Sequence, residues 1–393
     1  MMSDKVYVDA AYKSLIKYTE ELCGDNVEIV RNDDKYIVVL SDGLGSGVKA
    51  NILSTLTAKI ISTMLYEGST IEDTVDTIVH TLPICNIRKV AYSTFIILQI
   101  DHDGNAYLVE FDAPGCIFVR EGKLVPIDYS YREIAGKNIR EARFKVKPDD
   151  VLTLMSDGVI YAGIGQLMNL GWTWKNVSRY LLSHIKPGIT AARLTSMVSE
   201  TCNQLYMNKP GDDTTVAAVR ITGKKIVSLY SGPPVDPNSD ERLVTEFMIP
   251  EGKKIVCGGS SATIVSRVLK EPLTPSLEYI DPEIPPTAEI PGIDLVTEGV
   301  ITLKKAVDII KAYIEDPTDN ENLMKLEKKN GASLIAKMLV EECTHFNMFI
   351  GQKINPAHQN PDLPVDLSIK MLIMDQLYSL MIKAGKVVKR YYY

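Results

Sequence analysis

The chain has 393 residues, of which 45% are apolar and 24% are charged, and its formal net charge is −7. This composition is typical of a globular protein long enough for two domains, and it excludes a disordered or fibrous chain. The negative balance argues against nucleic acid as the main partner, because phosphate backbones are bound by clustered Lys and Arg. No run of about 18 apolar residues and no leader-like start are present, so we expect a cytoplasmic protein with no membrane partner.

Residues 1–222 alternate between strand and helix patterns without a regular βαβ repeat. An apolar segment at 35–40 predicts a buried strand, and a Gly-rich turn then leads into a helix that begins at Val48. Short extended runs between 93 and 155 are separated by turn sequences, which indicates an antiparallel meander. The expected helices are 48–68, 69–82, 174–184 and 190–206, and a final strand is expected at 214–221. This order predicts an α+β domain of layered sheets and helices.

Residues 223–393 are expected to form an accessory domain of unknown role. We predict a mixed α/β portion over 223–300, which holds a strand, a Gly-rich loop and a helix, and a mostly helical portion over 301–393. The helices predicted in the second portion are 302–314, 321–328, 333–346 and 366–386. The Met and Leu residues of 370–381 share one helical face, which predicts either core packing or the contact of a homodimer.

Carboxylates stand at the ends of several predicted strands. Ser-Asp-Gly follows two buried strands, at Asp42 and Asp157, whereas Asp25 and the pair Asp212-Asp213 precede two others. If these strands lie side by side, the carboxylates converge and repel one another unless cations neutralise them. Oxygen ligands favour hard ions such as Mg(II) or Mn(II), and a pair of these ions can activate water against a phosphoryl group.

These motifs have two other interpretations. Asp-Gly is a common turn dipeptide, so any single motif could be only a turn, but its repetition after two buried strands argues against this for the set. Gly43, Gly45 and Gly47 lie between a strand and a helix, as in a dinucleotide-binding fold. Position 48 is Val rather than the third Gly of the G-x-G-x-x-G fingerprint, which argues against dinucleotide binding.

The acidic motifs together resemble those of the SpoIIE-like branch of the metal-dependent serine/threonine phosphatases, the PPM superfamily. The matching segments are Asp42-Gly43-Leu44-Gly45-Ser46-Gly47, Ser156-Asp157-Gly158-Val159 and Gly211-Asp212-Asp213-Thr214-Thr215-Val216. Cys23-Gly24-Asp25 is similar to the family's first acidic motif, and Ala113-Pro114-Gly115 is similar to its mid-domain turn. The resemblance covers residues 1–222 in the family's order.

The resemblance implies a layered α-β-β-α sandwich that binds two Mn(II) or Mg(II) ions and hydrolyses phosphoserine or phosphothreonine in a protein. A hydroxide activated by the two metals would attack the phosphoryl group directly, with Asp42, Asp157 and Asp212 as the catalytic set. Asp42 would bridge the ions, and the Gly43 carbonyl would bind one of them. Asp25, Asp157 and Asp212 would complete the ligand shells, with support from Asp213. The implied substrate is a bacterial regulatory protein, such as a phosphorylated anti-sigma-factor antagonist.

Two departures from the family's pattern leave a second interpretation open. Position 44 is Leu where distant eukaryotic relatives carry a His, and no Arg matches the arginine that grips phosphate in those relatives. The alternative is a catalytically weak or inactive phosphatase fold that senses or scaffolds through residues 223–393. The complete acidic set favours the enzyme.

A second candidate site is the loop Gly258, Gly259, Ser260 and Ser261, which lies between a predicted strand and a predicted helix. Its backbone N–H groups could bind a phosphate or another anion, although the loop lacks the Lys of a P-loop. The alternative is a tight turn with a helix N-cap.

Overall fold

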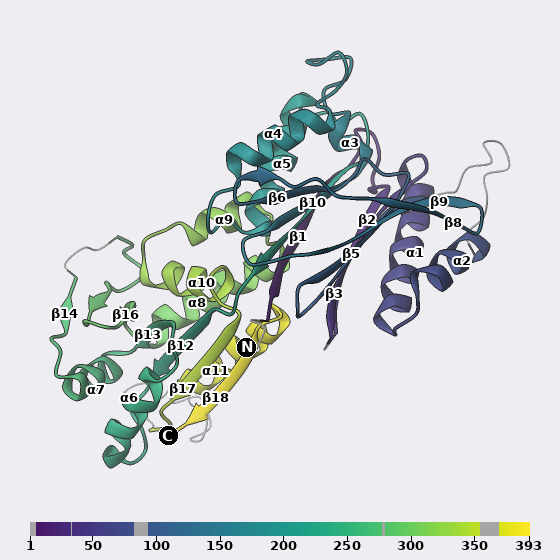
Figure 1. Cartoon of the computed structure of the whole chain (residues 1–393). Helices are drawn as coiled ribbons and strands as arrows, with labels where there is room; N and C mark the ends of the chain where they lie inside the picture. The colour runs from purple at the N-terminus through teal and green to yellow at the C-terminus, as the bar shows by residue number, and fades with distance from the viewer. Residues whose placement is uncertain (1–4, 33, 82–92, 277–279, 354–368) are drawn as a thin grey trace. The chain divides into compact units, whose positions relative to one another are not determined.

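The computed structural model describes residues 5–32, 34–81, 93–276, 280–353 and 369–393. The chain divides into two compact units, Met1–Gly223 and Lys224–Tyr393, and each unit is described by itself (Figure 1). Within the described ranges, no helix is both long enough and apolar enough to cross a membrane.

Among its described residues, the first unit has a six-stranded sheet and a five-stranded sheet, both antiparallel. The first sheet, in spatial order, consists of β2 (Asp25–Arg31), β3 (Lys35–Gly43), β4 (Ser93–Asp101), β5 (Asn105–Phe111), β9 (Lys137–Lys145) and β8 (Ser130–Ile134). The second sheet consists of β1 (Tyr7–Leu15), β11 (Thr214–Thr222), β10 (Val151–Met155), β6 (Ile117–Arg120) and β7 (Lys123–Leu124). The helices are α1 (Gly47–Tyr66), α2 (Ile71–Thr81), α3 (Asp157–Ile160), α4 (Trp174–His184) and α5 (Ala191–Leu205).

The two sheets of the first unit share one buried apolar core, to which Val38 and Leu98 of one sheet and Leu154 and Val219 of the other contribute. Apolar residues of α1 and α2 pack against other residues of the six-stranded sheet in a separate cluster. Helix α5 packs on β1 and β11. Strand β11 is buried along its whole length, as expected of a strand covered on both faces. The expected α+β class is confirmed, and the layers follow the order helix, sheet, sheet, helix.

In the second unit, a mixed sheet has the order β14-β15-β16-β13-β12-β17-β18. Its parallel strands are β16 (Leu295–Thr297), β13 (Lys253–Cys257), β12 (Ile226–Ser231), β17 (His345–Ile350) and β18 (Val387–Tyr392), and the short antiparallel strands are β14 (Thr274–Pro275) and β15 (Ala288–Glu289). The helical segments are η1 (Pro237–Ser239), α6 (Asp240–Met248), α7 (Gly259–Leu269), α8 (Val300–Glu315), α9 (Asn320–Leu326), α10 (Gly331–Val340) and α11 (Ile369–Lys383).

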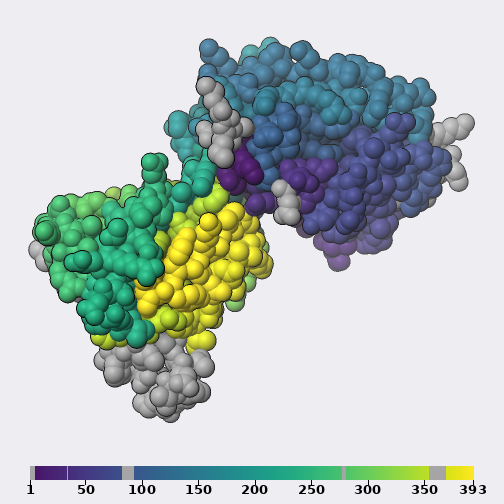
Figure 2. All heavy atoms as spheres, turned by 60° about the horizontal axis from the view of Figure 1, so that its bottom comes forward, coloured from purple at the N-terminus to yellow at the C-terminus, as the bar shows by residue number. Residues whose placement is uncertain are grey.

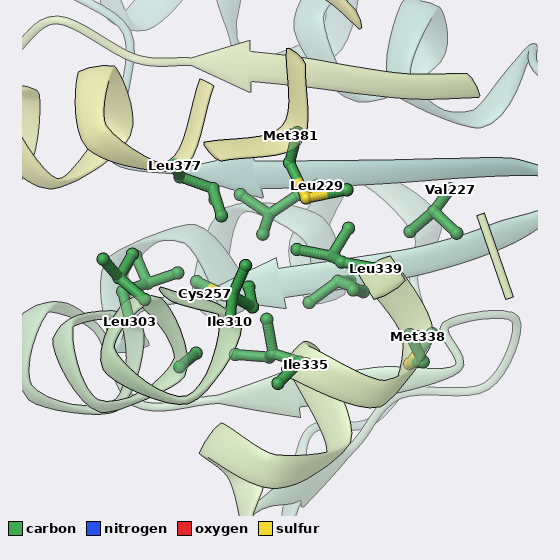
Figure 3. Packing of buried hydrophobic residues seen from close by; sticks show 14 of the residues in the cluster. Val227, Leu229, Cys257, Leu303, Ile310, Ile335, Met338, Leu339, Leu377 and Met381 are labelled. Atoms are coloured by element: carbon green, nitrogen blue, oxygen red, sulfur yellow. The ribbon is translucent and has the colours of Figure 1, made fainter. Parts of the chain in front are cut away.

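Helices cover both faces of the parallel part of this sheet. Alternate residues of β12 point to opposite faces, so Val227 and Leu229 join the core with α8, α10 and α11, whereas Tyr230 joins the core with α6 and α7. Figure 3 shows Leu229 together with Leu339 of α10 and Met381 of α11 in the first of these cores. The second unit is therefore a doubly wound α/β arrangement.

The prediction that residues 301–393 are mostly helical is wrong at two places, because β17 and β18 lie within that range. A helix was predicted over 333–346, but α10 ends at Val340 and β17 begins at His345. A parallel strand buried on both faces is a continuous apolar run, so periodicity does not separate it from the apolar end of a preceding helix. Strand β18 carries exposed basic and aromatic residues because it is the edge of the sheet.

The helical face predicted over 370–381 lies partly in the core, since α11 buries Ile373, Met374, Leu377 and Met381, whereas Leu372 is exposed. The described C-terminal residues, from α11 to Tyr393, are drawn in yellow in Figure 2 and gather on one part of this unit's surface.

We expect Leu154→Ala to lower the free energy of unfolding of the first unit by about 2–5 kcal/mol, because it leaves a cavity between the two sheets. The only tryptophans of the chain, Trp172 and Trp174, both lie in this unit, so denaturant melts followed by tryptophan fluorescence report on it alone. Leu167→Ala is the matched control, since this side chain is 60% exposed, and its effect should stay within about 0.5 kcal/mol. Equal effects of the two variants would contradict the described core.

Candidate metal centre

The ends of four strands bring the predicted carboxylates together. In the antiparallel pair of β2 and β3, Asp25 lies directly opposite Asp42. In the other sheet, the end of β10 lies beside the start of β11, where the Ser156 N–H donates to the Thr215 carbonyl at 2.9 Å. Asp157 comes just after β10 and Asp212 just before β11, so both carboxylates lie at the same end of this pair of strands.

Glycines next to these carboxylates allow the backbones to approach closely. A Cβ at Gly43 would lie 2.3 Å from the carbonyl oxygen of Ala50 in α1, and a Cβ at Gly158 would lie 2.1 Å from the carbonyl oxygen of Asp213. A Cβ at Gly24 would lie 2.7 Å from Asp213 Oδ2. No side chain fits against backbone atoms at the distances found for Gly43 and Gly158, which is the packing reason for glycine at these two positions.

The serines of the two Ser-Asp-Gly motifs hold the backbone beside each carboxylate. The Ser156 hydroxyl accepts a hydrogen bond from the Thr215 N–H at 2.9 Å. The Ser41 hydroxyl is hydrogen-bonded to that of Ser93, which also donates to the Asp42 carbonyl at 2.9 Å. These hydrogen bonds fix the backbone from which the side chains of Asp42 and Asp157 project, so the serines have a structural role.

A cavity of about 580 Å³ opens between these strand ends. Its lining includes Asp42, Gly43, Asp157, Asp212 and Asp213, all predicted from the sequence. Asp25 is not part of the lining and is only 4% exposed, opposite Asp42 in the sheet. The fold therefore gathers the predicted acidic residues at one place, with one of them buried.

Burial and mutual repulsion make these carboxylates hard to ionise without a cation. Burial, with the charges of Asp25, Asp157 and Asp212 adding to it, raises the pKa of Asp42 to about 9. The pKa of Asp25 rises to about 7, mainly through burial and further through Asp213 and Asp157. Burial also raises the pKa of Asp157 and of Asp212, and the nearby Lys17 partly offsets the rise for Asp212.

Several of these carboxylate oxygens have no hydrogen-bond partner although they are buried. Neither Oδ atom of Asp25 accepts a hydrogen bond of good geometry, although Ser156 and Thr215 lie near enough to lower the pKa of this carboxyl, and Oδ2 of Asp213 also has no partner. A buried oxygen without a partner is costly, and a divalent cation would satisfy it. Among the described residues, no three His, Cys, Asp or Glu side chains converge tightly enough to enclose an ion, so the carboxylates surround the cavity rather than a single point. The carboxylate oxygens suit a hard cation, which they would enclose after their side chains rotate into the cavity.

Two charged residues of the cavity lining were not predicted from the sequence, Lys17 and Asp112. Asp112 directly precedes Ala113-Pro114-Gly115, the segment that the sequence identifies only as a turn. This turn is held by Arg140, which donates to the Ala113 carbonyl at 2.9 Å and pairs with the buried Glu110. Lys17 follows β1, and its contact with Asp212 joins residues 195 positions apart, which no local pattern could indicate.

The loop Gly258 to Ser261 lies between β13 and α7, with Gly258 as the N-cap at φ 113°. The Ser261 hydroxyl accepts a hydrogen bond from the Gly232 N–H at 2.8 Å, whereas Gly259 and Ser260 are exposed. One side chain of the loop therefore has a structural partner, and anion binding there stays a prediction.

A family model described as Stage II sporulation protein E (SpoIIE) matches residues 32–222. This part of the chain belongs to the SpoIIE family of PP2C-type phosphatase domains. The matched range contains Asp42, Asp157, Asp212 and Asp213, while Lys17 and Asp25 precede it. Residues after 222 form an additional region outside the SpoIIE match. No curated protein sequence matches the chain closely enough to add to this comparison.

Solved structures that this chain resembles include the phosphatase domain of the Bacillus subtilis cell-fate determinant SpoIIE. That domain is 21% identical, with a TM-score of 0.43, over 56% of this chain and 94% of its own. RsbX in complex with magnesium is 18% identical, with a TM-score of 0.39, over 55% of this chain and 96% of its own. The RsbU and RsbW domains of a Mycobacterium tuberculosis protein are 15% identical, with a TM-score of 0.44, over 63% and 69% of the two chains.

We expect the metal-free SpoIIE domain to lose stability as the pH rises from about 4 to about 9. The folded pKa values of Asp25 and Asp42 lie above the usual value of 3.8, so the folded state holds protons that the unfolded state releases in this range. Mg(II) should reverse the trend, because it binds the ionised carboxylates. Thermal melts followed by tryptophan fluorescence across this range, with and without Mg(II), measure both effects.

Asp42→Asn should flatten the pH dependence and weaken stabilisation by Mg(II), since the amide does not titrate. Asp128→Asn is the control, because Asp128 is exposed and outside the cavity lining. A melting temperature of the wild type that rises with pH in the absence of metal would contradict the described electrostatics.

Proposed function

We propose that residues 1–222 hydrolyse phosphoserine or phosphothreonine in a protein substrate, with two Mn(II) or Mg(II) ions. The observation that carries the proposal is a cavity lined by carboxylates, next to buried carboxylate oxygens without hydrogen-bond partners. SpoIIE family membership of residues 32–222 supports the same reaction class. Clustered carboxylates of this kind require cations, and oxygen donors favour these two metals.

Asp42 is the residue best placed to bridge two ions. It stands on β3, which is paired on one side with β2 and on the other with β4, so its backbone is held from both directions. The Gly43 carbonyl, Asp25, Asp157 and Asp212 would complete the ligands, with Asp213 supporting them. When bound, the ions would polarise the phosphoryl oxygens and lower the pKa of an attacking water.

The remaining residues of the cavity hold and orient the substrate. A volume of about 580 Å³ accommodates a phosphorylated side chain with its flanking backbone. Leu44, Ile160 and Tyr161 line the cavity with apolar surface for the carbon atoms of that side chain. No His is found among the described residues of the lining, so we expect solvent to protonate the leaving serine or threonine oxygen.

The substrate class follows from the family alone. A phosphorylated bacterial regulator, such as an anti-sigma-factor antagonist, is the proposed substrate. Residues 223–393 are proposed as an accessory domain. A doubly wound sheet supports many unrelated functions, so this fold does not specify the function of the domain.

We expect the full chain to hydrolyse an aryl phosphate and a phosphoserine peptide only with Mn(II) or Mg(II). Asp42→Asn should lower kcat by about 100-fold or more, because it removes the carboxylate proposed to bridge the ions. Asp128→Asn supplies the same change of charge outside the cavity and should retain wild-type rates. Release of inorganic phosphate under initial-rate conditions is the measurement.

Hydrolysis that is absent with both metals, or that persists unchanged in Asp42→Asn, would rule out this proposal. The first result would favour the alternative function, in which an inactive phosphatase fold senses or scaffolds through residues 223–393.

A further inference from the structure

The cavity holds one positively charged side chain among its described lining residues, and this is Lys17. All the other charged residues of that lining are carboxylates, namely Asp42, Asp112, Asp157, Asp212 and Asp213. A phosphate monoester is itself an anion, so its entry into such a cavity is opposed by charge. Two divalent ions bring four positive charges to a site with five lining carboxylates and the buried Asp25. With all six carboxylates ionised, the site keeps two negative charges, and Lys17 offsets one of them.

The backbone of Lys17 is fixed beside the acidic motif that precedes β11. The Lys17 N–H donates to Asp213 Oδ1 at 3.0 Å, and the next residue, Tyr18, donates its N–H to the Pro210 carbonyl at 2.8 Å. The Lys17 carbonyl accepts a hydrogen bond from the Glu20 N–H at 3.0 Å. These contacts tie the segment after β1 to the loop that carries Asp212 and Asp213, so the position of Lys17 is part of the site.

The Lys17 side chain is free to change partners. Its Nζ lies 3.8 Å from Asp212 Oδ1, and the side chain is 33% exposed. This separation is longer than the ~2.8 Å of a charge-assisted hydrogen bond. If Asp212 turns toward an ion, the ammonium group remains at the cavity wall without its carboxylate and can donate to another oxygen.

We propose that the Lys17 ammonium binds a phosphoryl oxygen of the substrate and orients the phosphate monoester in the cavity. The inference rests on the proposed function, since it concerns the same site, and it adds a phosphate-binding residue that the acidic motifs do not contain. Arg140 is another basic residue that contacts the lining, since it donates to the Ala113 carbonyl, but its guanidinium is paired with the buried Glu110.

The test compares Lys17→Met, which removes the charge but keeps the length of the side chain, with Lys17→Arg, which keeps the charge. Lys209→Met is the matched control, since Lys209 is exposed, lies over the Tyr18 ring at 5.3 Å and is outside the cavity lining. Titration calorimetry of the Mn(II)-loaded full chain with inorganic phosphate measures the affinity directly and needs no turnover. Thermal melts followed by tryptophan fluorescence show that each variant is folded.

We expect Lys17→Met to weaken phosphate binding by about tenfold or more, the loss of one hydrogen bond to a charged group. KM for an aryl phosphate should rise by a similar factor, with a smaller change in kcat. Lys17→Arg should recover most of the affinity, and Lys209→Met should behave as the wild type. The affinity for Mn(II) should stay the same or increase in Lys17→Met, because a competing cation is removed from Asp212.

Wild-type phosphate affinity in Lys17→Met would overturn the inference, as would a loss of Mn(II) affinity equal to the loss of phosphate affinity. The latter result would mean that Lys17 only organises the carboxylates. Absence of turnover in every variant would contradict the proposed function, whereas the phosphate titration would still decide the role of Lys17.

Discussion

Repulsion between carboxylates at adjoining strand ends is the interaction on which the site of the first unit depends. Asp25 and Asp42 face each other across β2 and β3, and like charges directly opposite in a sheet are destabilising. Burial strengthens the effect, because little water is present to screen the charges. A fold keeps such an arrangement only if the rest of the domain is stable enough to hold it, or if a cation completes it.

The two-sheet core supplies that stability, and glycines bring the strand ends into place. Val38 and Leu154 lie in the core a few residues before Asp42 and Asp157, on the same strands. Beyond the core, Gly43 and Gly158 let the backbones approach to distances that no side chain would permit. The cavity is thus built on rigid elements, which favours precise placement of ligands.

The second unit follows a different physical pattern, since its parallel strands are covered by helices on both faces. Its apolar residues lie on both sides of β12, with Leu229 in one core and Tyr230 in the other. Because β12, β13 and β17 are parallel neighbours, their carboxyl ends lie at the same end of the sheet. Gly232, Gly258 and Gly351 follow these strands there. The region has its own core, so the SpoIIE domain and this unit are each complete as packed structures.

Local chemistry alone determined much of the first unit. The apolar strand before Asp42, the helices at 174–184 and 190–206, and the acidic motifs were all predictable, because each depends on residues close together in the chain. The helix predicted to end at 346 was wrong, since a buried parallel strand and a helix end share the same apolar composition. What only the tertiary structure decided is how the two sheets meet: the carboxylates of β2 and β3 near those of the β10 and β11 ends, the unpartnered oxygens, and Lys17 beside Asp212. These depend on sheet register and on how two sheets meet, which no local pattern encodes.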